Sequence, residues 1–170
     1  MPPAPPPAWP TSKALALVLP EISNIGFIAE SVRVPISSGS LIILVLSVQE
    51  EHAGRAVTRK AINNIYAEAA AHDPNSYLLY TDEQNVSCDI VGTPRAAAII
   101  EGHETHTRTA ELTIDLAKVR AFPESVLKSL ESTIISPQVT QAVIYGWYDN
   151  EMGSYVNMLG DRTVTVAEHL

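Results

Sequence analysis

Side chains able to do chemistry gather near the end of the chain, in the stretch GWYDNEMGSY at 146–155. It holds aromatic rings, two carboxylates, an amide and two glycines, directly after an apolar run. The amide of Asn150 can donate and accept hydrogen bonds at once, which suits a ligand contact. Asp149 and Asn150 are also common helix-capping residues. Both interpretations stay open together, since a cap would fix the geometry that presents Asn150.

Four other positions carry chemically useful groups. Cys88 is the chain's one thiol, and its apolar neighbours predict a strand and a structural role rather than a catalytic one. His103 and His106 are three residues apart, but Gly102 and nearby threonines favour a solvated loop over a helical metal site. Arg33 in VRVP offers a guanidinium fork suited to phosphate, the alternative being an ion-paired surface arginine.

Composition narrows the classes of function. The chain has 170 residues, a net charge of -8 and 46% hydrophobic residues, which predicts one globular domain with a real core. An acidic chain without a basic, aromatic-rich patch is a poor partner for nucleic acid. The longest apolar run, LIILVLSV at 41–48, is too short to cross a membrane. No signal peptide is evident, so a cytoplasmic setting is expected.

Apolar periodicity predicts an α+β fold. Residues 1–10 read as a proline-rich, disordered leader, and residues 11–170 as a single domain. We expect helices over 11–21, 53–73, 122–133 and 151–170. We expect strands over 26–35, 39–49, 77–81, 85–92, 95–102, 111–117 and 140–148.

The order of these elements predicts a mixed, largely antiparallel sheet with helices on one face. The run at 39–49 is apolar on both sides, so its outer face should be covered by helices of this chain or by another subunit.

Four stretches, in this order, resemble the catalytic domain of glyceraldehyde-3-phosphate dehydrogenase. They are SKALALVLPE at 12–21, VRVP at 32–35, SCDIVG at 87–92 and WYDNE at 147–151. The resemblance runs from about Thr11 to the C-terminus. It is weakest over 103–138, where this chain is longer than the family's usual connection.

The resemblance implies roles for four residues. Asn150 matches the asparagine that holds the nicotinamide carboxamide of NAD. Tyr155 stands one position after the place of the family's tyrosine beside that ring. Arg33 matches an arginine that contacts the phosphate of the substrate or the attacking inorganic phosphate. Thr11 lies near a family segment whose threonine also touches phosphate, although that segment's glycine is missing here.

The same resemblance sets limits on what the chain does alone. No G-x-G-x-x-G motif occurs, and the family's nucleotide-binding domain, cysteine nucleophile and histidine all lie upstream of the first matching stretch. We therefore expect the C-terminal part of an NAD-dependent, phosphorylating enzyme of glycolysis. It would be inactive alone, without catalytic or metal-binding residues, and would be a homo-oligomer through its sheet face. Its partners would be a phosphorylated aldehyde and inorganic phosphate.

Two alternatives stay open. The chain could be a non-catalytic structural or interaction domain derived from the enzyme, or an unrelated α+β domain with a chance match at WYDNE.

Overall fold

A computed structural model describes residues 10–24, 28–36, 38–49, 57–119, 124–127, 129–149, 151 and 153–170. The chain divides into two compact units, 1–35 and 36–170, and each is described by itself. The expected leader, apart from Pro10, lies outside the described residues.

The first unit contains helix α1 (Pro10–Val18) and the short 3-10 helix η1 (Pro20–Asn24). Proline at 20 cannot continue the first helix, because it lacks the backbone donor and clashes with the preceding turn. The expected helix over 11–21 is therefore confirmed with earlier bounds. The expected strand over 26–35 is wrong for residues 28–35, which are neither helix nor strand.

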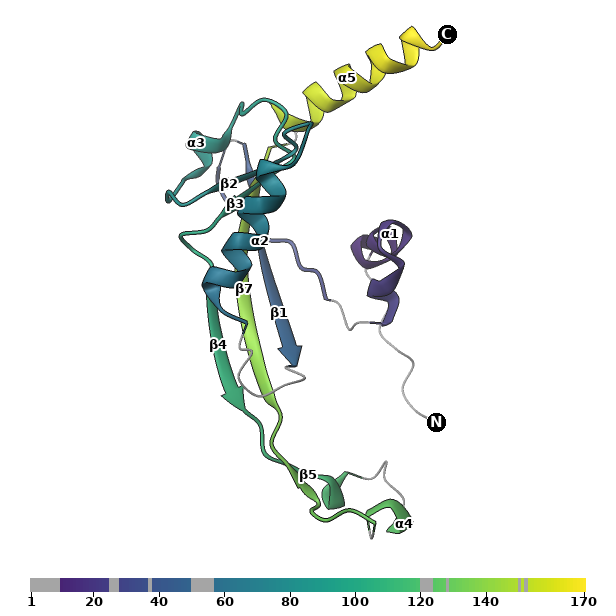
Figure 1. Ribbon diagram of the computed structural model, residues 1–170. Helices are drawn as coiled ribbons and strands as arrows, with labels where there is room; N and C mark the ends of the chain where they lie inside the picture. The colour runs from purple at the N-terminus through teal and green to yellow at the C-terminus, as the bar shows by residue number, and fades with distance from the viewer. Residues whose placement is uncertain are drawn as a thin grey trace. The chain divides into compact units, whose positions relative to one another are not determined.

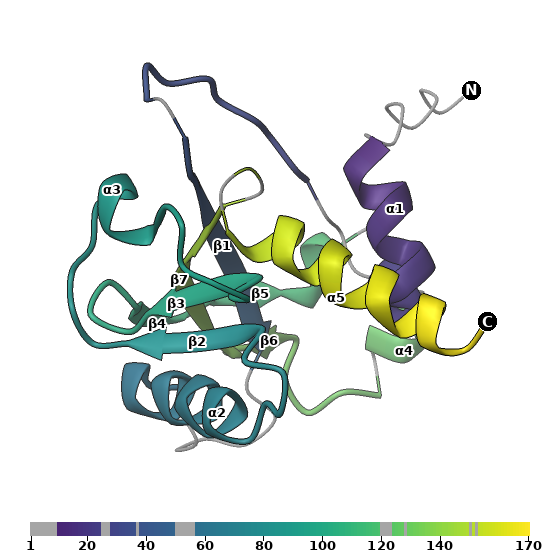
Figure 2. The same cartoon turned by 90° about the horizontal axis from the view of Figure 1, so that it is seen from above.

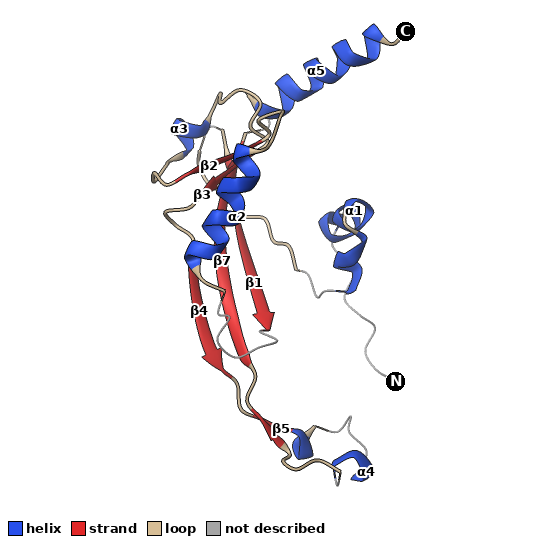
Figure 3. Ribbon diagram, in the orientation of Figure 1, coloured by secondary structure: helices blue, strands red, loops and turns tan. Residues whose placement is uncertain are grey.

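The second unit is built on a mixed, largely antiparallel sheet, as expected. Its strands are β1 (Ser40–Gln49), β2 (Leu78–Thr81), β3 (Ala98–Glu101), β4 (His106–Glu111) and β7 (Gln138–Tyr148). The order is β1-β7-β3-β2, and β4 also pairs with β7. The β2–β3 pair is parallel and the others are antiparallel. Figure 3 shows β1, β7 and β4 side by side as red arrows, with β7 in the middle.

A second, small sheet joins β5 (Ile114–Asp115) to β6 (Ile134–Ile135). The connection between them contains the 3-10 helix η2 (Leu116–Lys118) and helix α4 (Glu124–Leu127). The expected strand over 111–117 is therefore split between β4, β5 and η2. The expected helix over 122–133 shrinks to one turn among the described residues.

Helix α2 (Arg59–Ala71) covers one face of the main sheet (Figures 1 and 2). Its N-cap residue is Thr58, whose Oγ1 accepts a hydrogen bond from Ala61 N at 3.2 Å. Its Ile62 packs with Ile100, Ala142 and Ile144 in the larger hydrophobic cluster. Alternate residues of β7 are buried on this side, as the period of a strand requires.

Within the described part of the second unit, the opposite face of the sheet is covered at one end only. There Ile90, Ala96 and Ile99 form a second cluster, with Trp147 packed against it. Further along, the described residues leave an apolar surface that we call the open face, made of Leu41, Ile43, Val45, Val143 and Tyr145. Ile43 and Val45 are each 53% exposed. The outer face of β1 therefore has no cover from the described part of the second unit.

Helix α5 (Ser154–Glu168) ends the chain and confirms the expected C-terminal helix. Among the described helices, none combines the length and the apolar character that crossing a bilayer requires.

Candidate functional site

The C-terminal end of β7 delivers the WYDNE stretch to a region where two acidic side chains are buried. The first is Glu101, at the end of the neighbouring strand β3, which is 2% exposed. Trp147 Nε1 donates a hydrogen bond to Glu101 Oε2 at 3.0 Å, and Asn85 N donates to Glu101 Oε1. Glu101 thereby joins β7 to the segment that precedes the short helix α3 (Ser87–Ile90).

The second buried acid is Asp149, the residue after β7, which is 3% exposed. Its Oδ2 accepts from Gly92 N at 3.0 Å, and its Oδ1 accepts from Glu151 N at 3.0 Å. The hydroxyl of Ser38 donates to Asp149 Oδ1 at 3.4 Å and to Glu151 Oε2 at 3.2 Å. Asp149 thus connects the turn after β7 to the loop after α3 and to the residues before β1.

Glycine is favoured at two positions here, at 92 by the backbone conformation and at 153 by the close approach of the loop after α3. Gly92 has a φ of +84°, a conformation that side chains disfavour. A Cβ on Gly153 would lie 2.7 Å from the backbone oxygen of Thr93. The backbone of the turn therefore rests directly on the backbone of the loop, held on one side by Glu101 and on the other by Asp149.

The start of α5 lies directly after this turn. The N-cap residue of α5 is Gly153, which has no side chain to accept a hydrogen bond. Gly153 rather than Asp149 therefore occupies the N-cap position, and the carboxylate of Asp149 accepts from Gly92 N and Glu151 N; Asn150, the other expected cap, lies outside the described residues. Tyr155, an expected cofactor contact, is 44% exposed, and its ring meets that of Tyr148 edge-on at 6.2 Å.

The structure describes the other expected site residues only in part. Asn150 lies outside the described residues. Arg33 is an exposed residue of the first unit, and Asp149 belongs to the second unit. Thr11 lies in α1, where its side chain is not described. The roles expected for these residues and for Tyr155 stay predictions.

Cys88 differs from expectation, because it lies in α3 and is exposed. The apolar run around it predicted a strand over 85–92. Local hydrogen bonding forms a helical turn instead: Val86 N donates to Asp89 Oδ2 at 2.8 Å, and Thr93 Oγ1 donates to Ile90 O at 2.8 Å.

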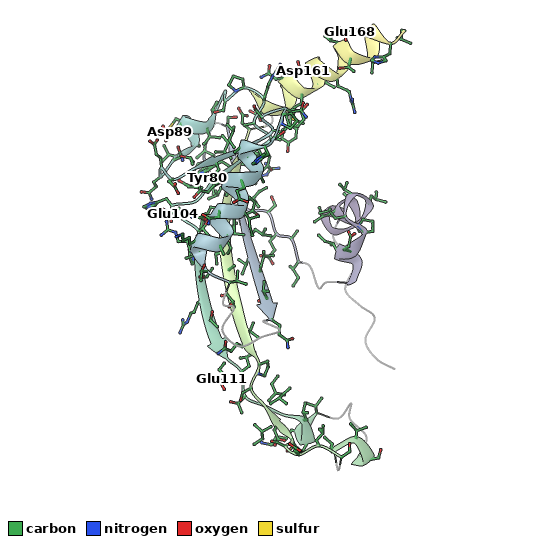
Figure 4. All side chains as sticks on the ribbon, in the orientation of Figure 1. Tyr80, Asp89, Glu104, Glu111, Asp161 and Glu168 are labelled. Atoms are coloured by element: carbon green, nitrogen blue, oxygen red, sulfur yellow. The ribbon has the colours of Figure 1, made fainter. Side chains whose placement is uncertain are left out.

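The histidine pair occupies the β3–β4 turn and the start of β4. His103 is an exposed turn residue, and His106 is the first residue of β4, with its Nδ1 2.8 Å from Glu104 O. Figure 4 labels Glu104, in the turn before β4, and Glu111, the last residue of this strand. The part of the chain that the structure describes holds no group of three or more metal-ligating side chains.

The β3–β4 turn is fastened to α2 through Gly102. Arg59 and Asn63 both donate to Gly102 O, at 3.1 and 2.9 Å. The ring of Tyr80 lies against Gly102, and its hydroxyl donates to Asp82 Oδ1 at 2.6 Å. Burial, and then this hydrogen bond, raise the pKa of Tyr80 to about 12. This cluster stabilises the end of β3, which carries Glu101.

The sequence reasoning missed the residues that hold the site together. The sequence patterns assigned no role to Glu101, Ser38 or Gly92. The signal available was a lone acid at the end of an apolar run, as in AIIE at 98–101. A charged residue there is either exposed or paired, and its partner cannot be read from the chain.

Comparison with known proteins gives consistent matches. The family described as "Glyceraldehyde 3-phosphate dehydrogenase, C-terminal domain" matches residues 5–125. Glyceraldehyde-3-phosphate dehydrogenase 2 of Streptomyces avermitilis is 33% identical over 159 residues, which are 94% of this chain and 36% of that protein. The Streptomyces coelicolor enzyme is 33% identical over 161 residues, and the Mycobacterium leprae enzyme 29% over 159. The chain therefore spans little more than a third of the length of these relatives.

Proposed function

The chain belongs to the glyceraldehyde 3-phosphate dehydrogenase C-terminal domain family, and we propose that it forms the C-terminal part of the catalytic domain of such an enzyme. The enzyme would be NAD-dependent, phosphorylating and cytoplasmic, and would act in glycolysis. The observation that carries the proposal is the turn after β7. There, a buried aspartate fixes the backbone on both sides of Asn150, the residue expected to meet the cofactor.

The residues of this region suit the nicotinamide end of NAD. The carboxamide of nicotinamide is a donor and an acceptor, and the side chain of Asn150 is its chemical complement. The edge-to-face pair of Tyr148 and Tyr155 adds aromatic surface at the start of α5. When bound, NAD supplies the hydride acceptor. This chain's part is to orient the nicotinamide ring, and its sequence holds no Gly-rich turn for the pyrophosphate.

Phosphate binding is the second proposed role of this chain. We assign it to Arg33, with Thr11 as a second proposed contact. The guanidinium of Arg33 is exposed in a stretch without helix or strand, where it is accessible to an anion. A guanidinium binds phosphate oxygens in pairs, so it can hold either the phosphorylated aldehyde or inorganic phosphate. We propose no catalytic residue on this chain, and we expect no dehydrogenase activity from it alone.

The open face supports the proposal of a homo-oligomer. Ile43 and Val45 pair across the β1–β7 ladder with Tyr145 and Val143, and Leu41 lies on the same face of β1, so they form one continuous apolar surface. Exposed apolar surfaces of this kind typically mark protein interfaces. Sedimentation of the purified chain tests this proposal, and a dimer or tetramer that Ile43→Lys converts to monomers is the expected result.

The enzymatic proposal is tested by assembling a whole enzyme. The matching C-terminal stretch of the Streptomyces avermitilis relative is replaced by this chain, and NAD reduction is measured with glyceraldehyde-3-phosphate and phosphate. We expect phosphate-dependent activity. Arg33→Ala should raise the KM for phosphate, and Asn150→Ala should raise the KM for NAD. The matched controls are Arg162→Ala and Asn75→Ala, two exposed residues that should change neither constant.

A second candidate is a non-catalytic interaction domain, which the open face favours. A folded, oligomeric chimera without NAD reduction would support this candidate against the enzymatic one. Activity that is insensitive to both Arg33→Ala and Asn150→Ala would remove these residues from the proposed site.

A further inference from the structure

Strand β1 forms one edge of the main sheet, and no described strand pairs with its outer side (Figure 3). All ten of its residues pair with β7 in an unbroken register, so this strand contains no bulge. Its sequence, SLIILVLSVQ, holds no charged residue and no proline. Soluble proteins usually protect a sheet edge with a charge, a proline or a bulge, and an edge without them is a template for a further strand.

The backbone and the side chains of β1 both restrict which strand fits there. Alternate residues of an antiparallel pair exchange backbone hydrogen bonds, so about half of the N–H and C=O groups of β1 point away from β7. Ile42, on the side of α2, is 52% exposed, and Ile43, on the open face, is 53% exposed. A strand added at this edge lies beside both sets of apolar side chains, so it should be apolar on both faces. Among the described strands, β1 itself has that composition.

Two copies of β1 complement each other when they run antiparallel. A two-fold axis normal to the sheet at Leu44 places Ile43 opposite Val45 of the second copy, and Ile42 opposite Leu46. Residues that lie opposite each other across an antiparallel pair point to the same side of the sheet. In this register the open faces of both copies therefore lie on one side, and apolar residues meet apolar residues on each face. A contact of this isologous kind closes after two copies.

We propose that the outer edge of β1 pairs with the same edge of a second copy of this chain, in the antiparallel register centred on Leu44. The second copy supplies main-chain hydrogen bonds along the strand, and side chains of the two copies cover each other on both faces. Two five-stranded sheets thereby become one continuous sheet. This contact differs from packing through the open face, and the inference does not require the open face to be buried.

The first measurement is hydrogen exchange of the β1 amides by NMR, at concentrations below and above the midpoint of association found by sedimentation. In the free chain, every second amide of β1 bonds to β7 and the amides between them exchange fast. Pairing at the edge protects this second set as well. We expect exchange of the second set to slow about tenfold or more as the chain associates.

The second measurement tests the register with charges at Ile42 and Leu46. These positions lie about 14 Å apart within one strand, but opposite each other between the two copies. Ile42→Lys/Leu46→Lys sets like charges against each other twice, and should raise the Kd of self-association about tenfold or more. Ile42→Lys/Leu46→Glu sets opposite charges there, and should restore association.

The matched control is Val143→Lys, which places a charge on the open face but on the central strand β7. It should leave the exchange pattern of β1 in the associated protein unchanged. Ile43→Lys does not serve as this control, because Ile43 lies both on the open face and at the edge.

Each result decides the inference. Slower exchange of the second set on association, weaker association of the two-lysine variant and recovery in the lysine–glutamate variant support it. The inference is overturned if the second set stays unprotected in the associated protein, or if the two charge variants behave alike. A chain that is monomeric at every concentration also overturns it, as does association that Val143→Lys abolishes and the two-lysine variant leaves intact. Should the two-lysine variant not fold, the exchange pattern of the unmodified chain decides alone.

Discussion

Replacing Glu101 by alanine is the sharpest test of how the region after β7 is held together. Glu101 lies at the end of β3 and is 2% exposed. The substitution removes both carboxyl oxygens and leaves the indole N–H of Trp147 and the backbone N–H of Asn85 without their acceptor. The backbone of β3 keeps its pairing with β2 and β7, so the change is confined to the side chain.

The expected loss in the free energy of unfolding follows from the two donors that are left without an acceptor. A buried donor left unsatisfied costs about 1–3 kcal/mol, and both donors here are partly reachable by water, so we expect a total loss of about 2–4 kcal/mol. For a domain of this size about 1 kcal/mol lowers Tm by roughly 2–4 °C, so the expected fall is about 4–16 °C. Glu101→Gln keeps one acceptor and the volume, and should lose about 1 kcal/mol.

The assay is urea unfolding of the purified chain. The free energies of unfolding of the variants are compared where their m-values are equal. A double-mutant cycle with Trp147→Phe should give a coupling of about 1 kcal/mol, because the two side chains share one hydrogen bond. Glu111→Ala, at the exposed end of β4, is the matched control and should change stability by less than about 0.5 kcal/mol. A Glu101→Ala variant as stable as this control would refute the anchoring role of the buried carboxyl group.

Three further predictions concern the neighbouring turns. The pKa of Tyr80 in the folded state is about 12, above the ordinary tyrosine value of about 10. The contribution of Tyr80 to stability is therefore complete below pH 10 and disappears as the pH rises toward 12. Tyr80→Phe should remove this loss of stability at alkaline pH, measured by urea unfolding. Gly102→Ala places a Cβ 2.1 Å from the Tyr80 hydroxyl and should cost about 1–3 kcal/mol in the same assay, as the ring must move. Hydrogen bonds from Leu78 N and Asn75 N lower the pKa of Asp73. The contribution of Asp73 to stability is therefore present above about pH 4 and disappears as the pH falls through the pKa of the folded state. Asp73→Asn should remove this part of the loss of stability in acid, measured as Tm against pH.

The strands that the sequence predicted well are those with strong apolar runs. The expected strands at 39–49 and 140–148 became β1 and β7, because their side chains form the two faces of the sheet. β4, with the sequence HTRTAE, was missed because its side chains are mostly polar and exposed. It forms a strand because its backbone pairs with that of β7. The hydroxyls of Thr109 and Thr140 lie 2.7 Å apart across this pair of strands. A pairing of this kind depends on a distant segment and leaves no local pattern.

The location of the candidate site was predictable from the sequence, but the hydrogen bonds that hold it in place were not. The stretch 146–155 was recognised from its composition, yet the role of Asp149 depends on Gly92 and Ser38, which no spacing rule connects to it. The apolar run around Cys88 pointed to a strand, whereas the bonds of Asp89 and Thr93 form a helical turn there. Sequence patterns report burial and periodicity, but a carboxylate's partners are set by the tertiary fold.

The two buried acids act on the α3 segment through its backbone rather than its side chains. Glu101 accepts from Asn85 N and Asp149 from Gly92 N, so the segment is fastened at both ends by groups that every residue except proline provides. Of the side chains between them, Ile90 is buried in the second cluster and Asp89 bonds the turn. Cys88 and its other exposed neighbours can therefore change without loosening the region after β7, whereas proline at 85, or any residue with a side chain at 92, should loosen it.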